Sequence, residues 1–233
     1  MQKLSTIAVI IPALNEAGNI RRLVEEIQAT KPGEVIVVDN GSTDATAQEA
    51  AKTGASVISE PRRGYGYACA AGAAAAQEVE ILVFIDGDGS FSPTELPQIL
   101  HPLLKDQADL VLGSRVLGYT APGAMPAHQR FGNWLASRLM NAIYDISITD
   151  LGPYRAIRRQ LLGQLNMEEM TFGWPTEMIV KAARQGGKIV EVPVSYHSRR
   201  TGRSKVSGTV RGTLLATWFI LGVTLRYAWK KDA

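Results

Sequence analysis

Three short apolar runs, each rich in β-branched residues, most strongly limit the folds open to this 233-residue chain. They span Ile7–Ile11, Val35–Val38 and Ile81–Ile85, and no polar residue interrupts any of them. A strand with one solvated face alternates apolar and polar residues, so unbroken runs predict strands that are covered on both faces. Strands of this kind are typical of parallel sheets with helices on either side.

Helical patterns separate these runs. Apolar residues within 20–27 recur at the spacing i, i+3, i+4, i+7 of an amphipathic helix. Further helices are predicted over 45–53 and 68–77, with a short strand at 55–59 between them. This alternation predicts an α/β fold, a Rossmann-like and mostly parallel sheet with helices on both faces.

The second half of the chain continues the alternation less regularly. Its predicted elements are a helix over 94–104, a strand over 109–113, a long loop over 117–127, a helix over 130–144, an irregular segment over 150–154, a helix over 177–185 and a strand over 188–194. Long loops in compact domains are usually functional or mobile.

Charge is distributed unevenly along the chain. Residues 1–100 carry 13 acidic and 7 basic side chains, whereas residues 101–233 carry 9 and 18. From Tyr196 onward, every charged residue except Asp232 is Lys or Arg. A basic tail of this kind attracts phosphates, nucleic acid or anionic lipid.

The C-terminal segment is also apolar. Residues 212–225 are uncharged and have basic residues on both sides, but a helix needs about 20 apolar residues to span a bilayer. Three interpretations are open: an amphipathic helix in the membrane interface, a buried or dimer-forming helix, and a span with Arg226 snorkelling to the interface. We therefore predict an α/β domain over 1–205 and a membrane-associating or oligomerising helix over 206–233.

The N-terminal apolar run and the cysteine content indicate where the protein acts and which bonds it can form. The run Ile7–Ile11 is too short for the core of a signal peptide and ends at Pro12, so we expect a protein of the cytoplasm, attached peripherally to the inner face of a membrane. Cys69 is the single cysteine, which excludes an internal disulfide and a multi-cysteine zinc site.

Polar side chains follow the apolar runs at their carboxyl ends, where parallel sheets bind ligands. Asn15 and Glu16 follow the first run, Asp39 the second, and Asp86 and Asp88 the third. Alternate residues of an extended chain point the same way, so Asp86 and Asp88 can aim two carboxylates at one point. Such carboxylates repel each other unless a divalent cation lies between them, and Mg²⁺ and Mn²⁺ favour carboxylates together with substrate phosphates. An acidic turn is the plainer alternative, but the neighbouring polar residues favour a site for a metal and a diphosphate.

Two other phosphate-binding patterns are missing from the sequence. There is no Gly-x-x-x-x-Gly-Lys-Ser/Thr loop, and Gly64–Ala68 lacks the Gly-x-Gly-x-x-Gly spacing of dinucleotide enzymes. These absences disfavour ATPases and dinucleotide-dependent enzymes.

Several ordered motifs resemble those of family 2 glycosyltransferases with the GT-A fold. These are Ile10–Glu16, Val37–Thr46, Gly64–Gly66 and the Asp-x-Asp of Asp86–Asp88. Later motifs are similar to the branch of dolichyl- or polyprenyl-phosphate mannose (or glucose) synthases: Gly113–Arg115, Asp150–Arg155, Glu177–Met178 and Tyr196–Lys205. Two positions depart from the branch, because Ser90 stands where a glutamine is frequent and Asn40 where a second aspartate is commoner.

The resemblance implies roles for particular residues. Metal binding, of Mg²⁺ or Mn²⁺, falls to Asp86 and Asp88. Contacts to the nucleotide sugar fall to Pro12, Asn15, Glu16, Asp39, Gly64, Asp86, Arg199 and Lys205. Contacts to the acceptor fall to Arg115, His128 and Arg130, and the catalytic candidates are Asp88, Arg130 and Glu177.

The resemblance predicts an inverting transfer of mannose or glucose from a GDP- or UDP-sugar. A polyprenyl phosphate acceptor is already ionised and needs positioning cations such as Arg130, Arg199 and Lys205. A hydroxyl acceptor, soluble or on a glycolipid, needs a base, for which Glu177 is the candidate. A third reading is a binding module with an inactive pocket. We expect a membrane surface as partner, no nucleic acid, and an apolar tail able to pair with a second copy.

Overall fold

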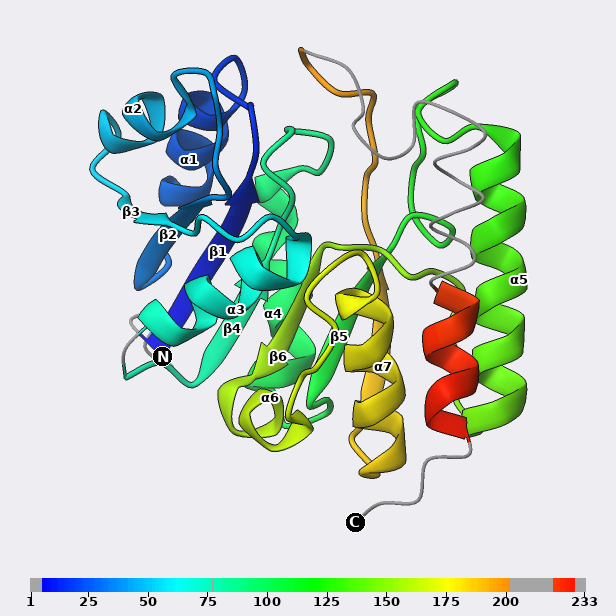
Figure 1. The fold of residues 1–233 in the computed structure, drawn as a ribbon. Helices are drawn as coiled ribbons and strands as arrows, with labels where there is room; N and C mark the ends of the chain where they lie inside the picture. Colours follow the sequence, from blue (N-terminus) through cyan, green and yellow to red (C-terminus); the bar gives the residue numbers. More distant parts are fainter. Residues whose placement is uncertain (1–5, 77, 202–219, 229–233) are drawn as a thin grey trace.

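The computed structural model describes residues 6–76, 78–201 and 220–228 (Figure 1). Within them lies a seven-stranded sheet in the order β3-β2-β1-β4-β6-β5-β7. Its strands are β1 (Ile7–Ala13), β2 (Glu34–Asp39), β3 (Ser56–Ser59), β4 (Ile81–Phe84), β5 (Leu110–Ser114), β6 (Arg155–Arg158) and β7 (Ile189–Pro193). Only β6 runs antiparallel to its neighbours among these strands. The predicted mostly parallel sheet is confirmed.

Helices cover both faces of the sheet (Figure 1). The first face carries α1 (Ile20–Gln28), α2 (Thr46–Ala51), the short 3₁₀ helix η2 (Pro93–Glu95) and α4 (Leu96–Leu104). The second carries α3 (Tyr65–Ala75), α5 (Ala127–Tyr144), α6 (Arg159–Leu165) and α7 (Trp174–Arg184). Strand β1 shows why its sequence lacks alternation: Ile7 and Val9 point into the first core, whereas Ala8 and Ile10 point into the second.

Residues 220–228 form a helix that packs beside α5 and α7. The hydroxyl of Tyr144 in α5 donates to the carbonyl of Thr224, and Arg184 of α7 donates to the carbonyl of Tyr227. Val223 and Tyr227 are buried in the second core. Leu225 and Arg226 of the same helix are exposed, and the three interpretations of the C-terminal segment stay predictions. Residues 206–219 lie outside the described residues, so the division at residue 205 stays a prediction.

A membrane-crossing helix is not found in the described part of the chain, where every helix is too short or too polar to traverse a bilayer.

Candidate functional site

A cavity of about 770 Å³ opens at the carboxyl ends of β1, β2 and β4. We call it the first cavity. Its walls come from segments far apart in sequence, including residues 171–172 with Pro175 at the start of α7, and the loop 196–199. Seven of the residues predicted from the sequence line it: Pro12, Glu16, Gly64, Asp86, Asp88, Arg115 and Arg199.

Asp86 and Asp88 form the acidic centre of the first cavity. Burial raises the pKa of Asp86 to about 7, and the negative charge of Asp88 adds to this effect. The Oδ1 atom of Asp86 is buried and has no hydrogen-bond partner among the described residues. Asp88 accepts a hydrogen bond from the backbone N–H of Ser90 at 2.9 Å. A buried carboxylate oxygen without a donor, beside a second carboxylate, has the chemistry of a cation ligand.

Arg199 enters this acidic centre from the loop after β7. Its Nε lies 3.3 Å from Oδ2 of Asp88, and its Nη2 pairs with Glu16. The same loop is tied to α1, because Thr201 Oγ1 donates to the Asn19 side chain at 2.8 Å. The loop therefore brings a cation from the second half of the chain to the strand ends. Lys205, its predicted companion, lies outside the described residues.

Asn15 and Asp39 do not line the first cavity. The side chain of Asn15 accepts a hydrogen bond from the N–H of Thr43 at 2.7 Å, and that of Asp39 accepts one from the N–H of Ser42 at 3.1 Å. Both side chains shape the turn after β2, at the rim of the site. Their assignment as nucleotide ligands stays a prediction.

Asn40 lines the cavity where the sequence had singled out Asp39. Its side-chain amide donates to the carbonyls of Glu60 at 3.0 Å and Arg62 at 2.7 Å, and its oxygen accepts from the N–H of Gly64 at 2.9 Å. An aspartate could not donate these two hydrogen bonds. Asn40 thus fastens the loop before α3 to the end of β2. The Asp39-Asn40 pair in the sequence was the only signal for it.

Gly64 is the N-cap residue of α3 and has a conformation that other residues rarely adopt, with a φ of 151°. A Cβ atom there would meet the carbonyl oxygen of Met170 at 2.3 Å. We expect Gly64→Ala to lower the free energy of unfolding by about 1–3 kcal/mol and to weaken donor binding. Gly163→Ala is the matched control, since Gly163 in α6 has nothing within 4 Å and alanine favours a helix. Denaturant unfolding measures both variants, and an unchanged Gly64→Ala protein would show that the contact is unimportant.

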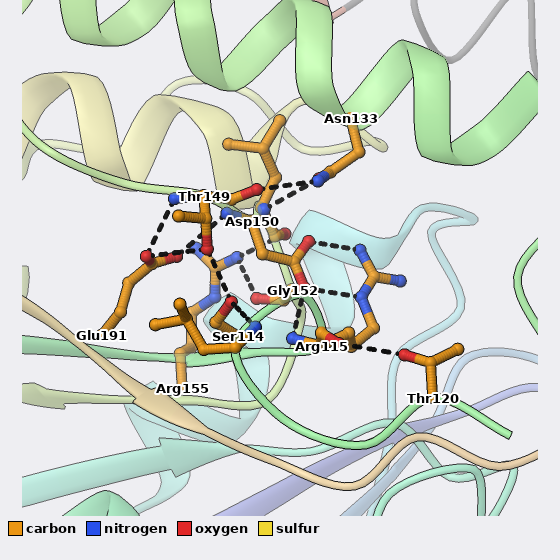
Figure 2. Close-up of polar contacts among 11 residues, drawn as sticks. Ser114, Arg115, Thr120, Asn133, Thr149, Asp150, Gly152, Arg155 and Glu191 are labelled. Atoms are coloured by element: carbon orange, nitrogen blue, oxygen red, sulfur yellow. Dashed lines mark hydrogen bonds and ion pairs between the residues drawn. The ribbon is translucent and has the colours of Figure 1, made fainter.

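Arg115 lies at the end of β5, where the Asp150 carboxylate holds it (Figure 2). Two donors of the guanidinium, Nε and Nη2, meet the two oxygens of Asp150 at 2.8 and 2.7 Å. Burial opposes the charge of Arg115, but the attraction of Asp150 outweighs it and raises the pKa of Arg115. Glu191 of β7 accepts hydrogen bonds from the N–H groups of Thr149 and Asp150, at 2.8 and 2.9 Å. This network holds Arg115 in a single orientation.

A second cavity of about 760 Å³ lies between α5 and the loop after β5. Arg115 lines both cavities, and Arg130 and Arg138 of α5 add two further cations to the second one. Ser137 also lines it, and its buried hydroxyl has no hydrogen-bond partner among the described residues. The second cavity therefore suits an anion that accepts hydrogen bonds.

The edge of the second cavity is apolar. Trp134 lines it and is 51% exposed, and Phe131, one turn earlier on α5, is 62% exposed. Val116 lines it from the opposite loop and is also exposed. His128 is exposed and lines neither cavity.

Glu177 lies in α7, away from both cavities, and is fully buried. Its carboxylate accepts hydrogen bonds from the N–H groups of Glu168 and Glu169 and from the hydroxyl of Tyr227. Lys181 pairs with it at 2.9 Å. The Glu177 carboxylate is thus held by several partners. Its role as a general base stays a prediction.

No group of three or more His, Cys, Asp or Glu residues suited to a metal occurs in the described ranges. Any ion at Asp86 and Asp88 would need further ligands from substrate or water, which is how proteins usually bind Mg²⁺.

Comparison with known proteins finds relatives along nearly the whole chain. The chain is 39% identical to an uncharacterized glycosyltransferase of Mycobacterium tuberculosis, over 90% of this chain and 94% of the relative. It is 30% identical to an undecaprenyl-phosphate mannosyltransferase of Micrococcus luteus, over 95% and 96% of the two chains.

A solved structure shares the fold. Glucosyl-3-phosphoglycerate synthase of Mycobacterium tuberculosis, crystallised with Mn²⁺, uridine diphosphate and phosphoglyceric acid, superposes with a TM-score of 0.78 at 24% identity. The likeness covers 98% of this chain and 80% of that one, and it confirms the GT-A fold. The family model for glycosyl transferase family 2 matches residues 8–165. Together with the relative of 39% identity, this match shows that the chain belongs to glycosyl transferase family 2.

Proposed function

We propose that this glycosyltransferase moves a hexose from a nucleoside diphosphate sugar to a polyprenyl phosphate at the inner face of a membrane. The observation that carries the proposal is the second cavity, which joins three arginines to an apolar edge. A lipid phosphate needs both features, cations for its head group and an apolar surface for its chain. The likeness to an undecaprenyl-phosphate mannosyltransferase supports the same acceptor class.

The donor belongs in the first cavity. Asn40 and Gly64 shape the wall on the β2 side, and Glu16 and Arg199 stand near Asp88. The fit of Asp86 and Asp88 to a divalent cation supports metal dependence, and Mn²⁺ accompanies uridine diphosphate in the solved relative. When bound, Mg²⁺ or Mn²⁺ would neutralise charge on the departing diphosphate.

The acceptor needs no base in this reaction. A phosphate monoester is largely ionised at neutral pH, so one of its oxygens can attack the anomeric carbon directly. The new C–O bond forms as the bond to the donor phosphate breaks, and the electron pair leaves with the nucleoside diphosphate. Arg130 and Arg138 hold the attacking phosphate, while Arg115, which lines both cavities, faces the two substrates. Attack opposite the leaving group inverts the anomeric configuration.

The same surface supports the proposed peripheral attachment to a membrane. Phe131, Trp134 and Leu135 expose apolar area along one side of α5, and Arg130 and Arg138 lie on the same helix. Exposed aromatic residues beside arginines suit the head-group region of an anionic bilayer. The soluble or glycolipid hydroxyl acceptor is the competing assignment.

An acceptor panel decides between the two. Nucleotide release from UDP-glucose and GDP-mannose is measured with a short polyprenyl phosphate, with the corresponding polyprenol, and with 3-phosphoglycerate. We expect turnover with the polyprenyl phosphate alone. Equal turnover with the polyprenol or the soluble phosphate would contradict the proposal.

The same assay tests the proposed contact between Arg130 and the acceptor phosphate. We expect Arg130→Ala to raise the KM for polyprenyl phosphate about tenfold or more, because a charge-assisted contact is lost, and to leave the donor KM unchanged. Arg21→Ala is the matched control, since Arg21 is exposed on α1 and pairs only with Glu25 among the described contacts. If Arg130→Ala raised the donor KM and left the acceptor KM unchanged, Arg130 would contact the donor and the assignment to the acceptor would be wrong.

A further inference from the structure

The Glu177 carboxylate joins α7 to the segment just before it, residues 168–169, and to the distant helix 220–228. Its oxygens accept hydrogen bonds from the N–H groups of Glu168 at 3.0 Å and Glu169 at 2.8 Å, and from the Tyr227 hydroxyl at 2.5 Å. Lys181, one turn along α7, completes the set at 2.9 Å. We call these five residues the Glu177 clamp.

The clamp fixes the segment that forms one wall of the first cavity. The carbonyl of Met170, next to the clamped Glu169, accepts a hydrogen bond from the N–H of Tyr67 at 3.1 Å. The same segment leaves no room for a Cβ at Gly66, which would come within 2.6 Å of the Glu169 carbonyl oxygen. Residues 171 and 172 then line the first cavity directly. A shift at Glu168 and Glu169 would therefore move the donor's wall.

The clamp also reaches the last described helix. Tyr227 is 2% exposed, and its ring lies under Lys181 and Arg226, with the cations 5.1 and 5.6 Å from its centroid. Burial and the hydrogen bond to Glu177 raise the pKa of Tyr227, so its hydroxyl keeps its proton and donates. Arg226 adds an ion pair with Glu168 at 3.2 Å. Helix 220–228 and α7 thus both contact the segment 168–169.

We infer that Tyr227 is a positioning residue for the donor site, and that it acts through Glu177 and the segment 168–172. The C-terminal helix then has a role beyond attachment, because its placement sets the wall against which the donor binds. This inference uses the proposed function only in taking a nucleoside diphosphate as the ligand of the first cavity.

Two tyrosine variants separate this role from general support of the helix. Tyr227→Phe keeps the buried ring and removes one donor to Glu177. Tyr144→Phe also removes a hydroxyl that binds helix 220–228, at the Thr224 carbonyl, but on the α5 side and away from the clamp. The full-length proteins are compared by calorimetry with UDP and GDP in the presence of Mn²⁺, by donor and acceptor KM, and by hydrogen–deuterium exchange of the peptide 166–172.

We expect Tyr227→Phe to weaken nucleotide binding and to raise the donor KM about three- to tenfold, with the acceptor KM unchanged. Exchange at Glu168 and Glu169 should accelerate, because the Glu177 carboxylate that accepts from their amides loses one of the donors that hold it in place. Tyr144→Phe should change neither nucleotide binding nor the exchange rates of Glu168 and Glu169.

Equal effects of the two variants, or a Tyr227→Phe protein that matches wild type in both binding and exchange, would overturn the inference. If the wild-type protein bound neither nucleotide, the proposed donor would be wrong, and the exchange data would still decide whether the clamp holds the segment 168–172.

Discussion

Asp88→Asn is expected to reduce sugar transfer about a hundred- to a thousandfold, as does the loss of one group that stabilises charge in a transition state. Asp86 and Asp88 are the carboxylates that the fold places together in the first cavity, and Asp86 has a buried oxygen with no donor among the described residues. Asparagine keeps the shape of Asp88 and can still accept the hydrogen bond from Ser90. The loss of activity would therefore come from the missing negative charge and not from altered packing.

The measurement is the initial rate over a titration of Mn²⁺, after chelation of bound metal. Wild-type enzyme should lose activity on chelation and regain it with Mn²⁺, while Asp88→Asn should respond weakly at any concentration. Asp145→Asn is the control, because Asp145 is exposed at the end of α5 and lines neither cavity. Full activity of Asp88→Asn without metal would remove the metal from the proposed mechanism.

Asp150→Asn is expected to produce the largest loss of stability, about 3–5 kcal/mol, because it leaves the Arg115 guanidinium without its counter-charge. The Asp150 side chain is fully buried and that of Arg115 is 14% exposed, so water can screen little of the lost attraction. Activity should fall as well, since Arg115 lines both cavities. Thermal unfolding should shift down by roughly 10 °C.

Asp106→Asn is the matched control for this prediction. It also removes a carboxylate from an arginine, Arg158, but Asp106 is 84% exposed and lies on the surface. An exposed ion pair is worth at most about 1 kcal/mol. If both variants unfolded at the same temperature, the Asp150–Arg115 pair would contribute nothing beyond a surface contact.

Much of the fold could be predicted because its central strands are apolar on both faces. The runs at β1, β2 and β4 need no tertiary context to be recognised as buried strands. Strand β6 could not be predicted in this way, because Arg155–Arg158 begins and ends with arginine and is irregular by pattern. Pairing with β4 and β5 makes it a strand, and backbone carbonyls of 151, 152 and 175 accept hydrogen bonds from Nη1 and Nη2 of the buried Arg155.

The start of α7 was predicted too late. α7 begins at Trp174, three residues before the predicted start, and has Pro175 at its second position. Proline is common in the first turn of a helix because no hydrogen bond is lost there. The predicted helix over 177–185 omits Gly173-Trp174-Pro175, although Pro175 marks the start of the helix.

The candidate site was partly visible in the sequence. Residues at strand ends, such as Asp86 and Asp88, could be placed together because parallel strands finish at one edge. Arg138 was not singled out, because its exposure to the second cavity depends on where α5 packs. Glu177 was weighed as a base from its motif alone, and its burial among backbone amides depends on a loop that no periodicity describes.

Strand β6 runs against its neighbours, and this reversal has a consequence for the chemistry. Each parallel strand delivers to the ligand-binding edge only the residues that come after it in the chain. A reversed strand starts at that edge, so it delivers the residues that precede it, and Leu151 and Pro153 reach the first cavity by this route while Asp150 secures Arg115. The fold thereby gains an extra wall segment that is fixed at one end by the pairing of β6 and at the other by the Asp150–Arg115 pair. A substitution at Leu151 or Pro153 would therefore alter the wall of the first cavity without touching any parallel strand end.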